Sequence, residues 1–222
     1  MCGIVGIYNL KNKSIKKSDI VKMTDILKHR GPDGQGFYIK KNIGLGHRRL
    51  AIIDLSARAA QPMENEDGSF VITYNGEIYN YLDLKKKLIK LGHVFRSNSD
   101  TEVLLHLFEE YGEKCLEKIK GVYAFAIWDE KNKKLFLARD KFGTKPLYYT
   151  FTKNKFIFAS EIKAILTNKE IKREVCYEAL NEYFTFQNIY SERTLFKNIK
   201  LLPAGHKMIV DKSGKIVYII GI

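Results

Sequence analysis

The residue best suited to take part in a chemical reaction is Cys2, which follows Met1 directly and precedes Gly3 and an apolar run. If Met1 is removed, Cys2 carries a thiol and a free α-amino group on one residue. The thiolate is the nucleophile, and a terminal amine with a pKa of about 7.7–8.0 can act as base for a thiol with a pKa of about 8.5. Glycine at position 3 would allow close approach of substrate or backbone. The alternative is a small buried hydrophobic residue near an ordinary N-terminus.

Other polar residues stand in unusual settings. Arg48 and Arg49 adjoin the apolar run 50–53, so at least one of them should point into a cleft or pair with an acid. Asn75-Gly76 follows an apolar segment, and the next apolar segment is helical. A hairpin therefore fits poorly, and we expect a turn that exposes the Gly76 amide beside the Asn75 side chain. Asp100 precedes a helical pattern, where it or Ser99 could simply be the helix cap.

Composition excludes several classes of protein. The 222 residues suit one large domain, or a domain with a tail, and 45% apolar residues allow a sizeable core. No apolar run is long enough to cross a membrane, and the N-terminus does not resemble a signal peptide. Three widely spaced cysteines favour a reducing, cytoplasmic location over a disulfide framework.

The net charge of +13 comes from lysines spread along the chain, which we interpret as a solvated surface rather than a nucleic-acid site. The five histidines do not pair with Cys, Asp or Glu at metal-ligand spacing, so no metal site is predicted.

Apolar periodicity predicts the elements that position these residues. Strands are expected at 3–9, 36–40, 43–54, 70–74 and about 93–96, an antiparallel meander at 122–128, 134–139, 146–151 and 155–159, and a last hairpin at 206–210 and 215–220. Helices are expected from a Ser18 cap to about 29, after an Asn80 cap to about 91, from about 100 to a break at Gly112, and at 161–166 and 176–186. Together they predict an α+β fold in which two antiparallel sheets pack face to face and are covered by helices.

Several of these stretches occur together in an order that resembles class II glutamine amidotransferases. They are Met1 to Ile7, His29-Arg30-Gly31-Pro32-Asp33, residues 47–54, Gln61-Pro62-Met63, residues 74–80, Ser99-Asp100-Thr101-Glu102, residues 121–126 and Ala138-Arg139-Asp140. Residues 143–149 and 160–164 narrow the resemblance to the N-terminal glutaminase domain of glutamine-hydrolysing asparagine synthetases. The similarity runs in order from residue 1 to about 210, so chance is a poor explanation for it.

This resemblance implies the N-terminal-nucleophile hydrolase fold, a four-layer αββα sandwich. It implies cleavage of L-glutamine to glutamate and ammonia, with Cys2 as nucleophile assisted by its own amine. Arg49 would hold the glutamine α-carboxylate and Asp100 its α-ammonium group. Asn75 and Gly76 would form the oxyanion hole. The remaining pocket lining would come from Leu50, Ala51, Ile52, Ile53 and Glu77.

Two departures limit what this chain is expected to do alone. Ala60 stands where the family usually has glycine, and no Ser-Gly-Gly-x-Asp-Ser pyrophosphate loop occurs before Ile222. We therefore expect an amidotransferase domain at 1–210, and at 211–222 a terminal hairpin that begins a linker to a synthetase domain absent from this chain. No cofactor is expected here, since ATP and Mg²⁺ belong to the synthetase domain in the resembling family.

The partners are expected to be L-glutamine and an ATP-dependent synthetase domain in the same or another chain, with a homodimer possible and with no nucleic acid or membrane. Two alternatives stay open: the glutaminase domain of an amidotransferase with a sugar or another carboxylate as acceptor, and a non-catalytic module that senses glutamine.

Overall fold

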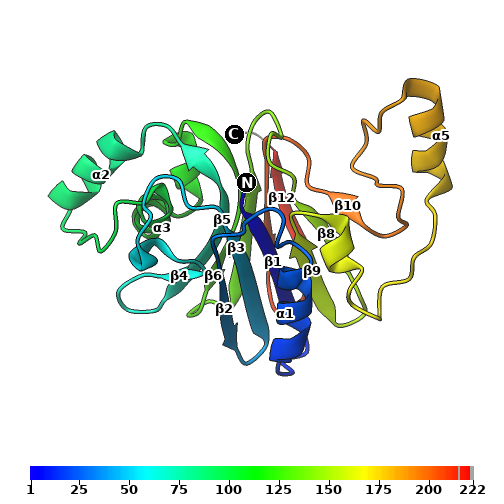
Figure 1. The fold of residues 1–222 in the computed structure, drawn as a ribbon, viewed down its shortest axis with the longest axis horizontal. Coiled ribbons are helices and arrows are strands. Elements are labelled where there is room, and N and C mark those ends of the chain that lie inside the picture. Colours follow the sequence, from blue (N-terminus) through cyan, green and yellow to red (C-terminus); the bar gives the residue numbers. More distant parts are fainter. Residues whose placement is uncertain (215, 221–222) are drawn as a thin grey trace.

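Two antiparallel sheets form the centre of the molecule in this computed structural model, which describes the backbone of residues 1–214 and 216–220 (Figure 1). The first sheet contains β1 (Gly3–Asn9), β2 (Gly34–Lys40), β3 (Ile43–Arg49), β8 (Tyr148–Phe151), β9 (Lys155–Ala159) and β10 (Lys200–Leu201), in the order β10-β8-β9-β1-β3-β2. The second contains β4 (Met63–Glu64), β5 (Phe70–Ile78), β6 (Gly121–Asp129), β7 (Lys134–Arg139), β11 (His206–Val210) and β12 (Ile216–Ile220), in the order β12-β11-β7-β6-β5-β4.

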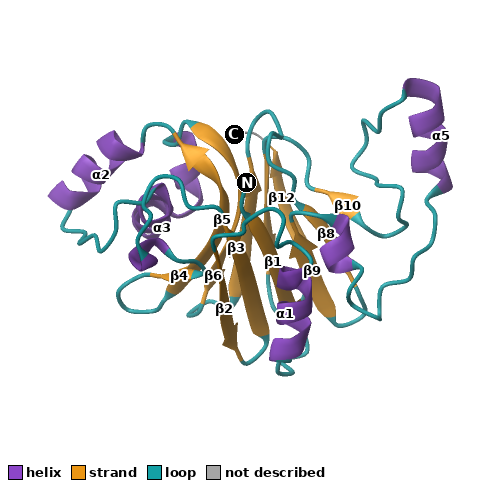
Figure 2. Ribbon diagram, in the orientation of Figure 1, coloured by secondary structure: helices purple, strands orange, loops and turns teal. Residues whose placement is uncertain are grey.

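Helices cover the outer faces of both sheets (Figure 2). On the first sheet lie α1 (Lys17–Asp25) and α4 (Ile162–Ile165), and on the second α3 (Asp100–Tyr111), against which α2 (Tyr81–Lys90) packs. Two short 3₁₀ helices, η1 (Ala57–Ala59) and η2 (Gly112–Glu117), complete this part of the chain, while α5 (Tyr177–Phe186) projects away from the sheets. None of the described helices is long and apolar enough to span a membrane.

Strand β1 shows why the layers stack as they do. Its side chains alternate between two cores: Ile4 and Tyr8 face the second sheet, whereas Val5 and Ile7 face α1 and α4. The ring of Tyr8 meets Trp128 of β6 edge-on, with ring centres 4.9 Å apart. A strand that is buried on both faces, as β1 is, has a continuous apolar sequence. The packing of the two sheets confirms the predicted α+β sandwich.

The predicted turn at Asn75-Gly76 is wrong, because both residues lie inside β5. Asn75 pairs with Ala124 and Gly76 with Tyr123 of β6. The partner strand continues past them, so sheet pairing overrides the local turn preference of the Asn-Gly pair. A Cβ atom at Gly76 would lie 2.4 Å from the carbonyl oxygen of Val122, which explains the glycine by close packing rather than by a turn.

The strand expected at 43–54 ends early, at Arg49. Its two neighbours begin at the same level, since Gly3 of β1 pairs with Arg48 and Gly34 of β2 pairs with Arg49. Residues 50–54 therefore have no partner strand and leave the sheet. The amide of Ala51 instead donates to Asp33 Oδ2 at 2.9 Å.

The expected four-stranded meander is also wrong, because its halves belong to different sheets. Strands β6 and β7 join β5, whereas β8 and β9 join β1. The loop 140–147 crosses between the sheets, and Asp140 fixes its geometry by accepting hydrogen bonds from the amides of Phe142, Thr144 and Lys145. The last hairpin is confirmed for 206–210 and 216–220, while residues 215, 221 and 222 lie outside the described residues.

Two local predictions are wrong, and a third is confirmed only in its position. The segment 93–96 is irregular rather than a strand, and the amide of Arg96 donates to the Glu102 side chain of α3 at 2.8 Å. Ser18 lies within α1, which begins after Lys16 without a side-chain cap. Asn80 occupies the cap position of α2, but its side chain bridges Lys118 O and Lys120 N instead.

Candidate active site

A hollow of about 150 Å³ opens where β1, β3 and β5 meet the start of α3. All the residues proposed from the sequence line it, although they come from four separate segments of the chain: Cys2, Arg49, Leu50, Ala51, Ile52, Ile53, Asn75, Gly76, Glu77 and Asp100. Residues 50–53 form one wall because they have left the sheet after β3. Met1 and Lys145 also line the hollow, and Lys145 Nζ lies 3.5 Å from Met1 Sδ.

Hydrogen bonds hold both the side chain and the backbone of Cys2. The Leu50 amide donates to Cys2 Sγ at 3.4 Å, which is suitable support for a thiolate. Arg30 Nε donates to the Cys2 carbonyl oxygen at 2.9 Å, and Arg30 Nη1 donates to Glu161 Oε1 at 3.0 Å. His29 Nε2 meets the same carboxylate oxygen at 2.9 Å. The ion pair between Arg30 and Glu161 thus positions the residue that carries the thiol.

Burial raises the pKa of the Cys2 thiol above its usual value, and Asp100 raises it further. The hydrogen bond from Leu50, the positive chain terminus and Arg49 act in the opposite direction. In this structure the positive terminus is the α-amino group of Met1, one residue away from the residue that carries the thiol. Removal of Met1 brings the amine onto Cys2 itself and strengthens the influence that favours the thiolate.

Asn75 is 2% exposed, and its Nδ2 is a buried donor with no hydrogen-bond partner among the described residues. A buried amide donor without an acceptor costs about 1–3 kcal/mol. Because Asn75 and Gly76 both line the hollow with Cys2, the site holds a side-chain amide donor and a glycine backbone beside a thiol. This arrangement suits an oxygen atom that acquires negative charge.

Arg49 stands at the rim of the hollow with its guanidinium held by backbone. Nη1 donates to Ser56 O at 2.8 Å, and Nη2 donates to Asp54 O. The Asp54 side chain is itself held by the amides of Asn98 and Ser56, and these bonds lower its pKa to about 2. The loop 54–56 therefore fixes the planar fork of Arg49, which has further donors to offer a carboxylate.

Asp100 is the first residue of α3 and also lines the hollow. Ser99 is the cap of this helix, as one of the two alternatives predicted, and its hydroxyl accepts from the Glu102 amide at 3.3 Å. Asp100 Oδ2 accepts from Tyr74 Oη at 2.7 Å and from the Ile78 amide at 3.0 Å. Burial raises the pKa of Asp100, while these hydrogen bonds oppose the rise. A cation entering the hollow would stabilise its ionised form.

Sequence reasoning gave no role to several residues that support the site. Gln61 accepts from the Tyr74 amide at 2.6 Å and donates to Thr101 at 3.1 Å, so it ties β5 to α3. His47 is fully buried with Nε2 3.1 Å from Tyr74 O, and burial lowers its pKa to about 4. His29-Arg30, Gln61 and Glu161 lie within the stretches that carry the resemblance, but only the fold shows which partner each one meets.

Replacement of Glu161 by glutamine tests the support behind Cys2. Partial burial opposes ionisation, but hydrogen bonds from Arg30, His29 and Lys163 lower the Glu161 pKa from 4.5 to about 2. The carboxylate therefore stabilises the folded state above pH 4.5, and this contribution disappears as the pH falls toward 2. We expect wild type to lose more stability than Glu161→Gln across that range, measured by urea unfolding. An equal change of unfolding free energy with pH in the two proteins would contradict the assigned pairing.

The site and the fold together define a class, a thiol-bearing αββα sandwich, and comparisons with known proteins agree. The family model for the glutamine amidotransferase domain matches residues 1–218. The chain therefore belongs to the glutamine amidotransferase domain family.

Its relatives include glutamine-hydrolysing asparagine synthetases. Asparagine synthetase 3 of Bacillus subtilis is 41% identical over 218 residues, which cover 96% of this chain and 35% of that protein. Putative asparagine synthetase 2 of Methanocaldococcus jannaschii is 41% identical over 231 residues, covering 95% of this chain and 44% of the relative. The chain thus spans about a third to less than half of the length of these curated relatives.

Solved structures confirm the fold. Glutamine phosphoribosylpyrophosphate amidotransferase from Bacillus subtilis, complexed with ADP and GMP, superposes with a TM-score of 0.71 at 22% identity. The match covers 98% of this chain and 49% of that one. At this identity the likeness concerns the arrangement of the two sheets, and it agrees with the N-terminal-nucleophile hydrolase sandwich expected from the resemblance.

Proposed function

We propose that this chain hydrolyses the side-chain amide of L-glutamine with Cys2 as nucleophile and delivers ammonia to an acceptor site outside these residues. The observation that carries the proposal is the Nδ2 of Asn75, which has no hydrogen-bond partner in the described part of the chain and lies in the hollow that contains the Cys2 thiol. Membership of the amidotransferase family supports it independently.

Binding is assigned to two charged residues that line the hollow. Arg49 would pair with the α-carboxylate of glutamine through its planar fork, and Asp100 would pair with the α-ammonium group. Both substrate charges lose water on entering, so each needs an opposite charge in place. The wall of residues 50–53 and Glu77 would complete the pocket around the aliphatic part of the substrate.

The reaction is assigned to Cys2 after removal of Met1. The α-amine takes the thiol proton, directly or through water, and the sulfur attacks the side-chain amide carbon. Asn75 Nδ2 and the Gly76 amide would donate to the oxygen that becomes negative. The amine returns the proton to the departing nitrogen, which leaves as ammonia, and a thioester forms between Cys2 and the glutamyl group. Water then attacks the thioester and releases glutamate and the free thiol.

We propose aspartate, activated with ATP and Mg²⁺ in a synthetase domain, as the acceptor system for the ammonia. Support comes from the relatives, whose names specify asparagine synthesis and whose chains extend well beyond the part matched here. The end of the amidotransferase domain near residue 210 and the formation of a homodimer stay predictions. A cytoplasmic location also stays a prediction, and it agrees with the three free cysteines. Together with a synthetase domain, in the same or another chain, the protein should form asparagine from glutamine, aspartate and ATP; transfer to a sugar instead would contradict this acceptor.

An assay of ammonia released from glutamine distinguishes an enzyme from a non-catalytic module that senses glutamine. The protein with Met1 removed should release ammonia and glutamate in equal amounts, with or without an added synthetase domain. Binding of glutamine without ammonia release in both conditions would favour the non-catalytic alternative.

Asp100→Asn is expected to weaken glutamine binding far more than turnover. Asparagine keeps an oxygen for Tyr74 but removes the charge that would pair with the ammonium group. A charged hydrogen bond contributes about 1.5–3 kcal/mol, which corresponds to about 10- to 150-fold in affinity. Calorimetry on the Cys2→Ala background measures affinity without turnover, and Arg49→Ala should behave likewise. An unchanged affinity in Asp100→Asn would remove Asp100 from the binding site.

The same assignment predicts a pH dependence. Burial raises the Asp100 pKa above its usual 3.8, and only the ionised carboxylate attracts an ammonium ion. Glutamine affinity should therefore fall as the pH decreases through a value above 3.8, and Asp100→Asn should lack this decrease. An identical pH profile in both proteins would contradict the assigned pairing.

A further inference from the structure

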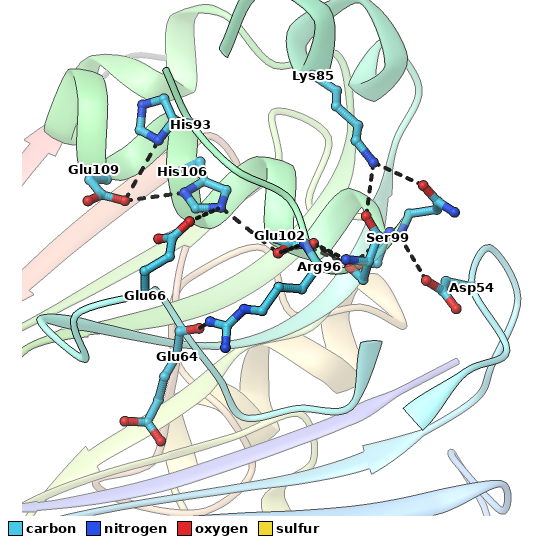
Figure 3. Close-up of polar contacts among 12 residues, drawn as sticks. Asp54, Glu64, Glu66, Lys85, His93, Arg96, Ser99, Glu102, His106 and Glu109 are labelled. Atoms are coloured by element: carbon cyan, nitrogen blue, oxygen red, sulfur yellow. Dashed lines mark hydrogen bonds and ion pairs between the residues drawn. The ribbon is translucent and has the colours of Figure 1, made fainter. Parts of the chain in front are cut away.

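A second cluster of polar side chains lies outside the hollow, between α3 and the segment that precedes it (Figure 3). His93 follows α2, while His106 and Glu109 are one turn apart on α3. One ligand atom from each of the three lies within 4.8 Å of the others. The sequence expectation that no histidine pairs with an acid at metal-ligand spacing is wrong for His106 and Glu109, and His93 joins them only through the fold.

The two imidazoles turn the same nitrogen toward a shared carboxylate. His106 Nδ1 lies 3.3 Å from Glu109 Oε2, and His93 Nδ1 lies 4.0 Å from the same oxygen. The rings are tilted against each other with centres 4.9 Å apart. His106 is 1% exposed, whereas Glu109 is partly exposed, so the cluster has one closed side and one open side.

The opposite nitrogens of both rings face further carboxylates. His93 Nε2 lies 3.2 Å from Glu110 Oε2, and His106 Nε2 lies 3.5 Å from Glu66 Oε1. In each ring, therefore, Nε2 meets an outer carboxylate while Nδ1 faces Glu109, and a carboxylate behind the ligating nitrogen is the arrangement found at metal-bound histidines. The same pattern on two rings from different segments is difficult to attribute to a solvated surface.

Charge also favours a cation at this place. The chain as a whole has a net charge of +13, yet four glutamates surround the two histidines: Glu66, Glu102, Glu109 and Glu110. The cluster therefore combines several carboxylates with imidazole nitrogens, which are groups that zinc-type ions take as ligands.

We propose that His93, His106 and Glu109 bind a divalent transition-metal ion of the zinc type, with water as the fourth ligand. Two histidines and one carboxylate with an open position form a recurrent zinc ligand set. Tetrahedral zinc with ligand bonds of about 2.0–2.1 Å requires ligand atoms roughly 3.3 Å apart. The three atoms must therefore approach by at most about 1.5 Å, and the proposal requires His93, which lies on an irregular segment, to make this movement when the ion binds.

The proposed site is connected to the hollow through Glu102. His106 Nε2 lies 4.0 Å from Glu102 Oε1, and Glu102 accepts from the amides of Arg96 and Ser97. Ser97 Oγ meets Ser99 Oγ, the cap of α3, at 2.9 Å. A metal bound by His93 and α3 would fasten the segment 93–99 to the helix that begins with Asp100, so it should stabilise the folded protein.

Zinc binding is best measured in the Cys2→Ala protein, because an N-terminal thiol and amine could themselves chelate zinc. Metal-stripped protein titrated with zinc chloride should bind one ion per chain, raise the unfolding temperature, and give a tetrahedral visible spectrum when cobalt(II) replaces zinc. His93→Gln and Glu109→Gln should weaken binding by about 100-fold, and Glu110→Gln by about 10-fold, as expected for an outer partner. His206→Gln, outside the cluster, should bind as the parent does.

Two results would overturn the proposal. One is the absence of saturable zinc binding in parent protein that is shown by circular dichroism to be folded. The other is equal zinc affinity in the parent and in His93→Gln. Circular dichroism of each metal-free variant separates lost binding from lost folding, and His93 and Glu109 are chosen because they are less buried than His106.

Discussion

Cys2→Ala is expected to eliminate glutamine hydrolysis while glutamine binding persists. The substitution removes the sulfur that would form the thioester but leaves Arg49, Asp100 and the walls of the hollow in place. Loss of a nucleophile that acts with its base typically lowers turnover by about 10⁴- to 10⁶-fold. Ammonia release should therefore fall to background, whereas calorimetry should still detect glutamine.

Cys176→Ala is the matched control for this variant. Cys176 is also a free cysteine but lies before α5, where its thiol contacts Glu178. It should retain the activity of the parent. Equal loss of activity in both variants would indicate a general effect of removing a thiol, and retained activity in Cys2→Ala would disprove the assignment of the nucleophile.

Asn75→Ala is expected to lower turnover by about 10²- to 10³-fold with little change in glutamine affinity, as for other oxyanion-hole donors. The reason is that Nδ2 has no partner among the described residues of the free protein and gains one only when charge develops on the substrate oxygen. The stability of Asn75→Ala should fall only by the amount that lost side-chain packing explains. The substitution breaks no hydrogen bond of Nδ2 to the described residues, because this buried donor is unsatisfied in the free state.

Asn65→Ala serves as the contrasting substitution. The Asn65 side chain already has partners, since it donates to Ser69 and accepts from the Phe70 amide. Its replacement should reduce stability and leave turnover nearly unchanged. A large loss of affinity rather than turnover in Asn75→Ala would place Asn75 in ground-state binding instead of the oxyanion hole.

Much of the fold was accessible from periodicity because the strands and helices of this chain carry ordinary patterns. The exceptions arise where tertiary pairing decides. Asn75-Gly76 has the composition of a turn, but β6 continues beside it and keeps it in β5. Likewise, β8 and β9 follow β7 in sequence, yet β9 pairs with β1 and β8 pairs with β9, a choice that local patterns do not encode.

The site residues were identified as a set because the resemblance supplied their roles, and the hollow brings all of them together. Composition and spacing alone could not have selected Arg49 over Arg48. In the structure Arg48 pairs with Asp25 of α1, whereas Arg49 lines the hollow. The Arg30–Glu161 pair and the cluster around His93 join segments that are distant in sequence or separated by a loop, so only the fold could reveal these contacts.

The most direct test of the central assignment is mass spectrometry of the protein quenched in acid during turnover of glutamine. The account predicts that the mature chain begins with Cys2 and that a fraction of the N-terminal peptide carries a glutamyl group on the Cys2 sulfur, absent from Asn75→Ala protein or present at a much lower level. A mature chain that retains Met1, or active protein in which no glutamyl adduct forms on Cys2, would contradict it.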